Sequence, residues 1–310
     1  MNSPLPLHQS HSSTASSSQT AAPPSSEPSL LPGVNILLEG PAGTGKTYQI
    51  GSLVETGVEV FFLGLEAGIE SLVGYFSDPP RSCEPPPNLH WHTLQLAMPG
   101  GFGKMAENAK LIANSTYAAL CKVQDFTRAQ NNPFERMLSV MNNFRDQRTG
   151  KEYGPVDSWG PDRCIVIDGL TGLGDFAMAM QVGMRPVKDK PDYMVSQDTI
   201  SRFIKYCCDG CKCHFVLIAH IEREVDEAQG GSKIYPSAPG QKLGPKLPSM
   251  FSDTILTVRR GAEWSWSTGD PMADLKTRNL SVSEKIEPGF AQIISKWKSR
   301  GGRLSPNVRV

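Results

Sequence analysis

The stretch of residues 37–54, LLEGPAGTGKTYQIGSLV, limits the possible folds more than any other part of this chain. Its middle matches the pattern G-x-x-x-x-G-K-[ST] at every fixed position. A short apolar run precedes the loop and a helix-compatible run follows it, so we expect a buried strand, a tight loop and a helix. Backbone N–H groups of such a loop converge on phosphate oxygens. The residues predicted to bind phosphate are Gly40, Pro41, Ala42, Gly43, Thr44, Gly45, Lys46 and Thr47.

Two side chains of this loop have specific expected tasks. Lys46 would reach the β- and γ-phosphates of a nucleoside triphosphate, and the Thr47 hydroxyl would be a ligand of Mg²⁺. The loop therefore predicts ATP and Mg²⁺ as bound groups.

Two further apolar runs end in acids. The run VEVFFLGLEAG, residues 58–68, contains Glu66, and the run RCIVIDGLTGL, residues 163–173, places Asp168 after four apolar residues. In open parallel sheets, functional groups collect at the carboxyl ends of the strands. We expect Asp168 to hold Mg²⁺ together with Thr47. Glu66 is a candidate catalytic residue that orients or deprotonates the attacking water; a helix N-cap or a surface acid is the alternative.

The run HFVLIAHIERE, residues 214–224, predicts another buried strand, which ends at His220. A polar side chain at this position could sense the γ-phosphate and transmit its state to the following segment. Residues 221–247 follow as a long predicted loop, and a loop of this length is usually functional or disordered. The runs SDTILTVRR and EWSWST then predict a β-hairpin, followed by DLKTRNL with Lys276 and Arg278.

Two groups of residues raise the question of a metal. His90 and His92 lie two residues apart on a predicted strand, but no acid or cysteine partner is evident. Cys207, Cys208, Cys211 and Cys213 precede His214, yet no second C-x-x-C follows. We expect reduced thiols in the second group, although the sequence leaves metal binding by Cys207–Cys213 open.

Composition bounds the remaining possibilities. The chain has 310 residues, enough for one large α/β domain or two small ones, and a formal net charge of zero, so any nucleic-acid surface must be local. No run of 18 apolar residues and no secretory signal is present, so we expect no membrane span. Seven cysteines beside an ATP motif indicate a reducing, cytoplasmic location.

The same composition divides the chain into three parts. Residues 1–30 are rich in Ser, Pro, Thr and Gln and predict a disordered tail. Residues 31–282 predict the ATPase core. Residues 283–310 predict a C-terminal helix and a basic tail, which is either a solvated end or a contact for a phosphate backbone.

The order of these motifs resembles the RecA-like ATPase core of recombinases and ring helicases, over about residues 33–282. GPAGTGKT is shared with many families, whereas FLGLEAG and IVIDGLTGL together are more specific. The segment KTRN resembles the Lys-x-Arg finger of replicative ring helicases, in which both cations reach the neighbouring subunit's ATP. VLIAHIERE followed by PKLPSMFSDTILTV is similar to a class of phage-encoded RecA-like ATPases, some of which act in single-strand annealing or recombination.

This resemblance implies an α/β fold with a mostly parallel central sheet flanked by helices. It also implies a DNA-stimulated ATPase that forms a ring or a filament, with Lys276 and Arg278 acting as catalytic residues in trans. Single-stranded DNA would contact loops at about residues 178–196 and 221–247, and a single-strand binding protein is a further implied partner. A phage-encoded protein would work in the host cytoplasm.

Other functions stay open on the sequence alone. A motor of the helicase or DNA-packaging type is the main alternative, although the chain leaves no room for a nuclease domain after residue 282. A P-loop kinase for a small molecule, or a scaffold that binds ATP only to assemble, fits less well.

Overall fold

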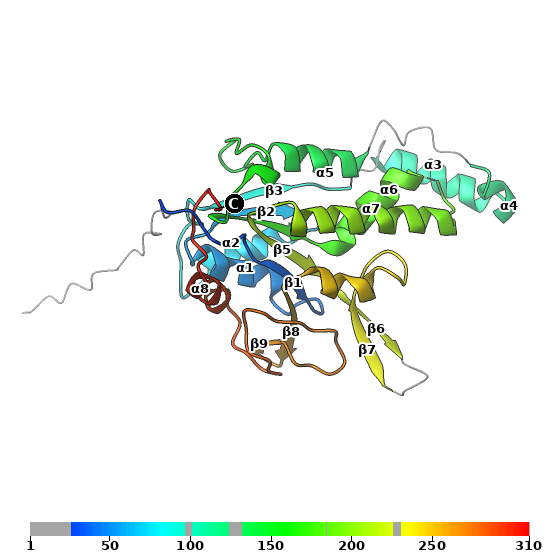
Figure 1. Cartoon of the computed structure of the whole chain (residues 1–310). Helices are drawn as coiled ribbons and strands as arrows, with labels where there is room; N and C mark the ends of the chain where they lie inside the picture. Colours follow the sequence, from blue (N-terminus) through cyan, green and yellow to red (C-terminus); the bar gives the residue numbers. More distant parts are fainter. Residues whose placement is uncertain (1–25, 97–100, 124–131, 184, 226–230, 310) are drawn as a thin grey trace, which may run out of the picture.

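The fold is built on a seven-stranded sheet with the strand order β3-β2-β4-β5-β1-β8-β9 (Figure 1). The computed structural model describes residues 26–96, 101–123, 132–183, 185–225 and 231–309. The strands of the sheet are β1 (Asn35–Glu39), β2 (Glu59–Gly64), β3 (Leu89–Thr93), β4 (Arg163–Asp168), β5 (His214–Ala219), β8 (Asp253–Arg260) and β9 (Glu263–Ser267). Every neighbouring pair is parallel except β8–β9, which is an antiparallel hairpin. The predicted α/β class with a mostly parallel sheet is therefore confirmed.

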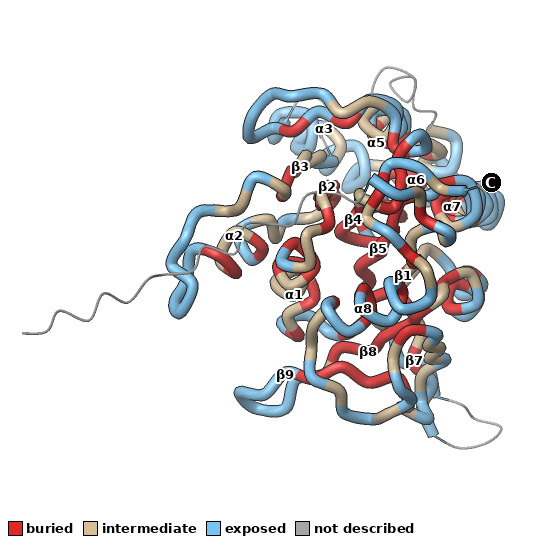
Figure 2. Tube along the Cα trace, turned by 60° about the vertical axis from the view of Figure 1, so that its left-hand side comes forward, coloured by how far each residue is buried: buried red, intermediate tan, exposed pale blue. Residues whose placement is uncertain are grey.

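Helices cover both faces of this sheet, which is why its strands are continuous apolar runs. One face packs against α5 (Pro133–Asn142), α6 (Leu170–Val182) and α7 (Lys190–Asp209). The other packs against α1 (Lys46–Val54), α2 (Ile69–Ser77) and α8 (Ala291–Ser299). All six residues of β5 are buried, as expected for the middle of such a sheet (Figure 2). Two further helices, α3 (Gly101–Ala113) and α4 (Tyr117–Leu120), contain no buried residue.

The register of the strands decides what meets at their carboxyl edge. Gly64 of β2 lies beside Asp168 of β4, and Asp168 lies beside Ile218 of β5. Glu39, the last residue of β1, lies beside Ala219. The loop at residues 40–47, hereafter the P-loop, thus begins at the same edge at which β2, β4 and β5 end.

Two predicted loops are in fact largely regular structure. Of residues 178–196, only 183–189 connect α6 to α7, because a capping box of Asp189 and Asp192 begins α7 at Lys190. Of residues 221–247, two stretches form the antiparallel hairpin of β6 (Ile221–Val225) and β7 (Ser232–Pro236). A 3₁₀-helix, Gly244–Met250, follows it, and another spans Val156–Ser158. Backbone pairing between β6 and β7 thus replaces much of the long loop that the sequence predicted.

The two ends of the described chain pack together on the core. Ser29 is buried and bridges to Val308, and Trp297 of α8 donates from Nε1 to the carbonyl of Pro32 over 2.8 Å. Residues 26–30, placed in the tail by composition, are therefore partly ordered by backbone pairing with the C-terminal segment; residues 1–25 lie outside the described residues. Across the described residues, no helix is both long and apolar enough to cross a membrane.

Candidate active site

The P-loop folds around its own lysine. Lys46 begins α1 and is 6% exposed, and its Nζ donates to the carbonyls of Gly40 and Pro41 over 2.8 and 2.7 Å. Burial lowers the pKa of Lys46 to about 8, against the opposing charges of Asp168 and Glu66, which raise it. The two hydrogen bonds hold the ammonium group inside the loop. It lies at the amino end of α1, where anions bind favourably.

Glycines permit this conformation at two positions. Gly45 precedes α1 with a φ of 80°, a left-handed conformation that side chains disfavour. A Cβ at Gly40 would lie 2.1 Å from Oγ1 of Thr257, so the loop can approach β8 this closely only with glycine there. The loop is thus shaped both by its own backbone and by a neighbouring strand.

Thr47 and Asp168 are brought into direct contact. The Thr47 hydroxyl donates to Oδ2 of Asp168 over 2.6 Å. Burial raises the pKa of Asp168 to about 6; the hydrogen bond from Thr47 lowers it, the charge of Glu66 raises it and the charge of Lys46 lowers it. A hydroxyl and a carboxylate side by side are oxygen ligands of the kind that Mg²⁺ prefers.

Glu66 is held in a fixed position beside these residues. It follows the end of β2, and its Oε1 accepts a hydrogen bond from the backbone N–H of Gly172, in the first turn of α6, over 2.8 Å. Its Oε2 lies 3.6 Å from Nε2 of His220. His220 follows β5 directly, so two strand ends supply this carboxylate–imidazole pair.

One cavity of about 620 Å³ brings together most of the predicted site residues. It is lined by the P-loop residues Ala42, Gly43, Gly45, Lys46 and Thr47, and by Glu66, Asp168 and His220. The buried lysine, the loop whose shape requires glycines and the Thr47–Asp168 pair fit a nucleoside triphosphate with Mg²⁺. The remaining P-loop residues do not line this cavity. The backbone carbonyls of Gly40 and Pro41 accept hydrogen bonds from Lys46, and the Thr44 hydroxyl contacts Thr257 of β8.

The β8–β9 hairpin adds two residues that the sequence did not indicate. Trp264 lines the same cavity, and one atom of its ring lies 3.6 Å from the position of a Cβ at Gly45. The guanidinium of Arg259 lies 5.3 Å from the centre of the Trp264 ring and approaches Gly43. The run EWSWST predicts the strand, but only the parallel pairing of β8 with β1 places the hairpin beside the P-loop.

Lys276 and Arg278 lie away from this cavity. The backbone of Lys276 pairs with Thr254 near the beginning of β8, and Oδ1 of Asp253 accepts from the N–H of Arg278 over 2.9 Å. Both residues line a separate cavity of about 530 Å³ that also contains Asn35, the first residue of β1. This cavity is therefore at the amino edge of the parallel strands, opposite the P-loop.

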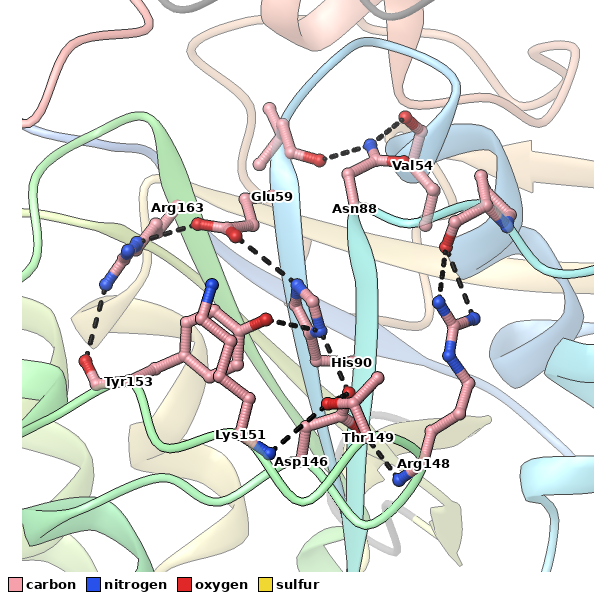
Figure 3. A network of polar contacts seen from close by, with 12 residues as sticks. Val54, Glu59, Asn88, His90, Asp146, Arg148, Thr149, Lys151, Tyr153 and Arg163 are labelled. Atoms are coloured by element: carbon pink, nitrogen blue, oxygen red, sulfur yellow. Dashed lines mark hydrogen bonds and ion pairs between the residues drawn. The ribbon is translucent and has the colours of Figure 1, made fainter.

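The two histidines considered for metal binding have other contacts. Nδ1 of buried His90 lies 3.2 Å from Asp146, and its Nε2 lies 3.3 Å from Glu59 (Figure 3). Nδ1 of His92 contacts the carbonyl of Arg145 over 2.8 Å. This network joins β2, β3 and the segment that follows α5.

The cysteine group lies in the core between α7 and β5. Cys207, Cys211 and Cys213 are buried, all as free thiols. Hydrogen bonds from Cys207 and Cys213 lower the pKa of Cys211. Within the part of the chain that the structure describes, no three His, Cys, Asp or Glu residues are arranged to hold a metal ion.

The fold and this site define a P-loop ATPase. Residues 33–283 match the family model described as AAA domain, and the chain belongs to that family. A search of curated proteins finds no match.

Several solved structures are similar to this chain. The RadB recombinase is 12% identical, with 83% of this chain and 86% of that chain covered and a TM-score of 0.36. The flagellar accessory protein FlaH from Methanocaldococcus jannaschii is 11% identical, with 84% and 89% covered and a TM-score of 0.32. The ATPase domain of G40P is 11% identical, with 81% and 79% covered and a TM-score of 0.32.

Proposed function

We propose that this ATPase couples ATP hydrolysis to the binding of single-stranded DNA. It would act as a homo-oligomer in phage recombination, annealing or replication. The observation that supports hydrolysis, the step on which the proposal depends, is the fixed position of Glu66, held by Gly172 and adjacent to His220 in the cavity of the P-loop. A site that only bound ATP for assembly would not need a carboxylate held in this place.

Binding follows from the groups that line the cavity. The P-loop amides and Lys46 would hold the phosphates, and Thr47 and Asp168 would hold Mg²⁺. When bound, Mg²⁺ would neutralise charge on the β- and γ-phosphate oxygens. Trp264, half-exposed at the edge of the cavity, would stack against the base.

Hydrolysis requires a water molecule in line with the γ-phosphate. Glu66 would orient this water and accept its proton, because Gly172 holds its carboxylate at one oxygen and the other oxygen lies in the cavity beside His220. His220 lies within 3.6 Å of that second oxygen and would donate to it or to the water.

His220 also offers a route from the site to the β6–β7 hairpin. Its backbone carbonyl accepts from the N–H of Ser237, so the residue closes the base of the hairpin over 2.7 Å. A shift of the His220 side chain on hydrolysis would therefore move the hairpin that we expect to contact DNA.

Lys276 and Arg278 would complete the site of the next subunit. Their position at the edge of the sheet opposite the P-loop suits a head-to-tail assembly, in which one subunit's amino edge meets its neighbour's carboxyl edge. A cation supplied in this way would stabilise charge on the transferring phosphoryl group.

The test is ATP hydrolysis by the full chain with and without single-stranded DNA, beside Glu66→Gln. We expect DNA to stimulate the wild type, salt to weaken that effect, and the variant to bind ATP but hydrolyse it at least about 100-fold more slowly. Hydrolysis that is indifferent to any nucleic acid would overturn the DNA assignment in favour of a motor with another partner or a small-molecule kinase.

A further inference from the structure

A second cavity lies on the outer side of the P-loop. It has a volume of about 520 Å³ and is separated from the ATP cavity by the loop itself. Its walls come from the β6–β7 hairpin, the β8–β9 turn and the segment around residues 270–272. We define this cavity as the arginine groove, after the three arginines that line it: Arg223, Arg259 and Arg260.

These arginines are exposed and have no acidic partner among the residues that the structure describes. Within the described residues, none of the three forms an ion pair, whereas Arg81 and Arg163 on other surfaces pair with Glu55 and Glu59 at 2.9 and 2.8 Å. Asp270 is the acid among the residues that line the groove, and its Oδ1 accepts from the N–H of Met272. The groove therefore carries excess positive charge in a chain whose net charge is zero.

Strand alternation concentrates this charge on one face of the hairpin. Arg223 pairs with Ile234 across β6–β7, and both line the groove. Glu222 and Glu224 flank Arg223 in the strand and point to the opposite face. The acids of β6 are thereby kept away from the groove.

Part of the lining of the groove is apolar. Ile221, Ile234, Val258 and Met272 line it together with the arginines. Guanidinium groups suit a backbone of phosphates, and an apolar surface suits the faces of unpaired bases. Inorganic phosphate alone would not use the apolar residues, and a duplex would not expose its bases to them.

The groove is also joined to the nucleotide site. Ala42 lines both cavities, so an occupant of the groove touches the residue that borders the phosphates on the other side. The Thr44 and Thr257 hydroxyls lie 2.6 Å apart and connect the buried part of the loop to β8, the strand that supplies Arg259.

We propose that the arginine groove binds single-stranded nucleic acid and presses it against the outer face of the P-loop. This inference rests on the proposed function and adds a surface that the resemblance does not include, namely the β8–β9 turn and the P-loop exterior. Strand binding and ATP binding then stabilise the same loop from its two sides, which makes them mutually reinforcing.

The test measures binding of a fluorescent 20-nucleotide oligothymidylate to the full chain by anisotropy, at several salt concentrations. The variants are Arg223→Gln, Arg260→Gln and the double substitution. The matched control is Arg202→Gln, an arginine on the exposed face of α7 that pairs with Asp198. Affinity for ATP is measured separately with a fluorescent ATP analogue.

We expect the double variant to bind the oligonucleotide at least about tenfold more weakly. The slope of its salt dependence should be smaller by about 0.7 for each phosphate that the variant no longer binds. Arg202→Gln should bind like the wild type, and affinity for the ATP analogue should be unchanged in all variants when no DNA is present.

Three results would overturn the inference, and they differ from one another. If the wild type binds the oligonucleotide and the double variant binds it equally well, the strand lies elsewhere and the proposed function stands. If the wild type does not bind it at all, both proposals fall. The third result concerns poly-aspartate as a competitor. If it displaces the oligonucleotide completely at equal charge concentration, and if its own binding is lost in the Arg223→Gln, Arg260→Gln double variant, the groove is a site for an acidic protein segment.

Discussion

The hydroxyl groups of Thr44 and Thr257 lie 2.6 Å apart, although 213 residues separate them in the chain. Thr257 Oγ1 also donates to the carbonyl of Glu39 over 3.1 Å, so one side chain of β8 contacts both the end of β1 and the middle of the P-loop. The loop is therefore shaped by tertiary contact as well as by its glycines.

Thr257→Val keeps the shape of this side chain but removes both hydrogen bonds. We expect the free energy of unfolding to fall by about 1–2 kcal/mol and affinity for ATP to weaken, because the buried Thr44 hydroxyl keeps only its bond to Pro41. Urea unfolding and ATP titration measure the two effects. Thr56→Val, which removes one hydrogen bond at the end of α1, is the control and should leave ATP affinity unchanged.

Trp264 gives a prediction about the base of the nucleotide. If the indole stacks on it, Trp264→Ala should weaken ATP binding by about 1–3 kcal/mol, the range measured for stacking of a base on an aromatic side chain. Trp264→Phe should retain most of the affinity. Calorimetric titration of the wild type and both variants with ATP and with inorganic triphosphate checks the prediction. Triphosphate has no base that could stack on the indole, so its affinity should not change. Equal losses for both ligands would contradict stacking.

The position of Arg278 gives a prediction about assembly. Lys46→Ala and Arg278→Ala should each be inactive alone, the first through its own P-loop and the second through its neighbour's. Mixing them should restore measurable hydrolysis, because a Lys46→Ala subunit still offers Arg278 to an intact site. A mixture that stays as inactive as its components would show that Arg278 does not act in trans.

The carboxyl group of Glu39 predicts that the free energy of unfolding falls as the pH rises, the reverse of the usual effect of an acidic residue. It is buried, neither carboxylate oxygen has a hydrogen-bond partner among the described residues, and burial, with a contribution from Asp274, raises its pKa from 4.5 to about 8. The folded chain therefore holds this proton more tightly than the unfolded chain. Stability from this group falls as the pH rises from about 4.5 to about 8.

Glu39→Gln removes the ionisation that causes this fall. We expect the variant to match the wild type at pH 5 and to exceed its free energy of unfolding by about 2–5 kcal/mol at pH 9. Chemical denaturation at a series of pH values checks this. Parallel pH profiles of the two proteins would refute it.

Asp146, which contacts Trp91 and His90 of the edge strand β3, predicts the opposite behaviour. Burial raises its pKa, but hydrogen bonds from Thr149, the Arg148 and Trp91 backbone and His90 outweigh that effect and place the pKa below 3.8. This group's contribution is complete well above pH 3.8 and is lost as the pH falls through its folded pKa.

Asp146→Asn should therefore be less stable than the wild type at pH 7, by about 1–3 kcal/mol, and the difference should shrink toward pH 3. Unfolding in urea at pH 3, 5 and 7 measures it. Glu152→Gln, which alters a surface contact to Asn143 in the same segment, should show no such trend.

Local sequence patterns were sufficient to predict the phosphate-binding and catalytic residues that line the ATP cavity. The P-loop match, the acid after β2, the acid that ends β4 and the histidine after β5 are each encoded within about ten residues, and parallel pairing alone brings strand ends to one edge. Lys46, Thr47, Glu66, Asp168 and His220 could therefore be predicted to lie together.

Only the tertiary structure decided the rest. Trp264, Arg259 and Thr257 reach the P-loop because β8 pairs with β1, a contact between segments more than 200 positions apart that no local periodicity encodes. The same holds for Ser29, which backbone pairing with the last residues orders. Short-range patterns specify which side chains are present at strand ends, whereas long-range pairing and burial decide what surrounds them, because those depend on the packing of the whole chain.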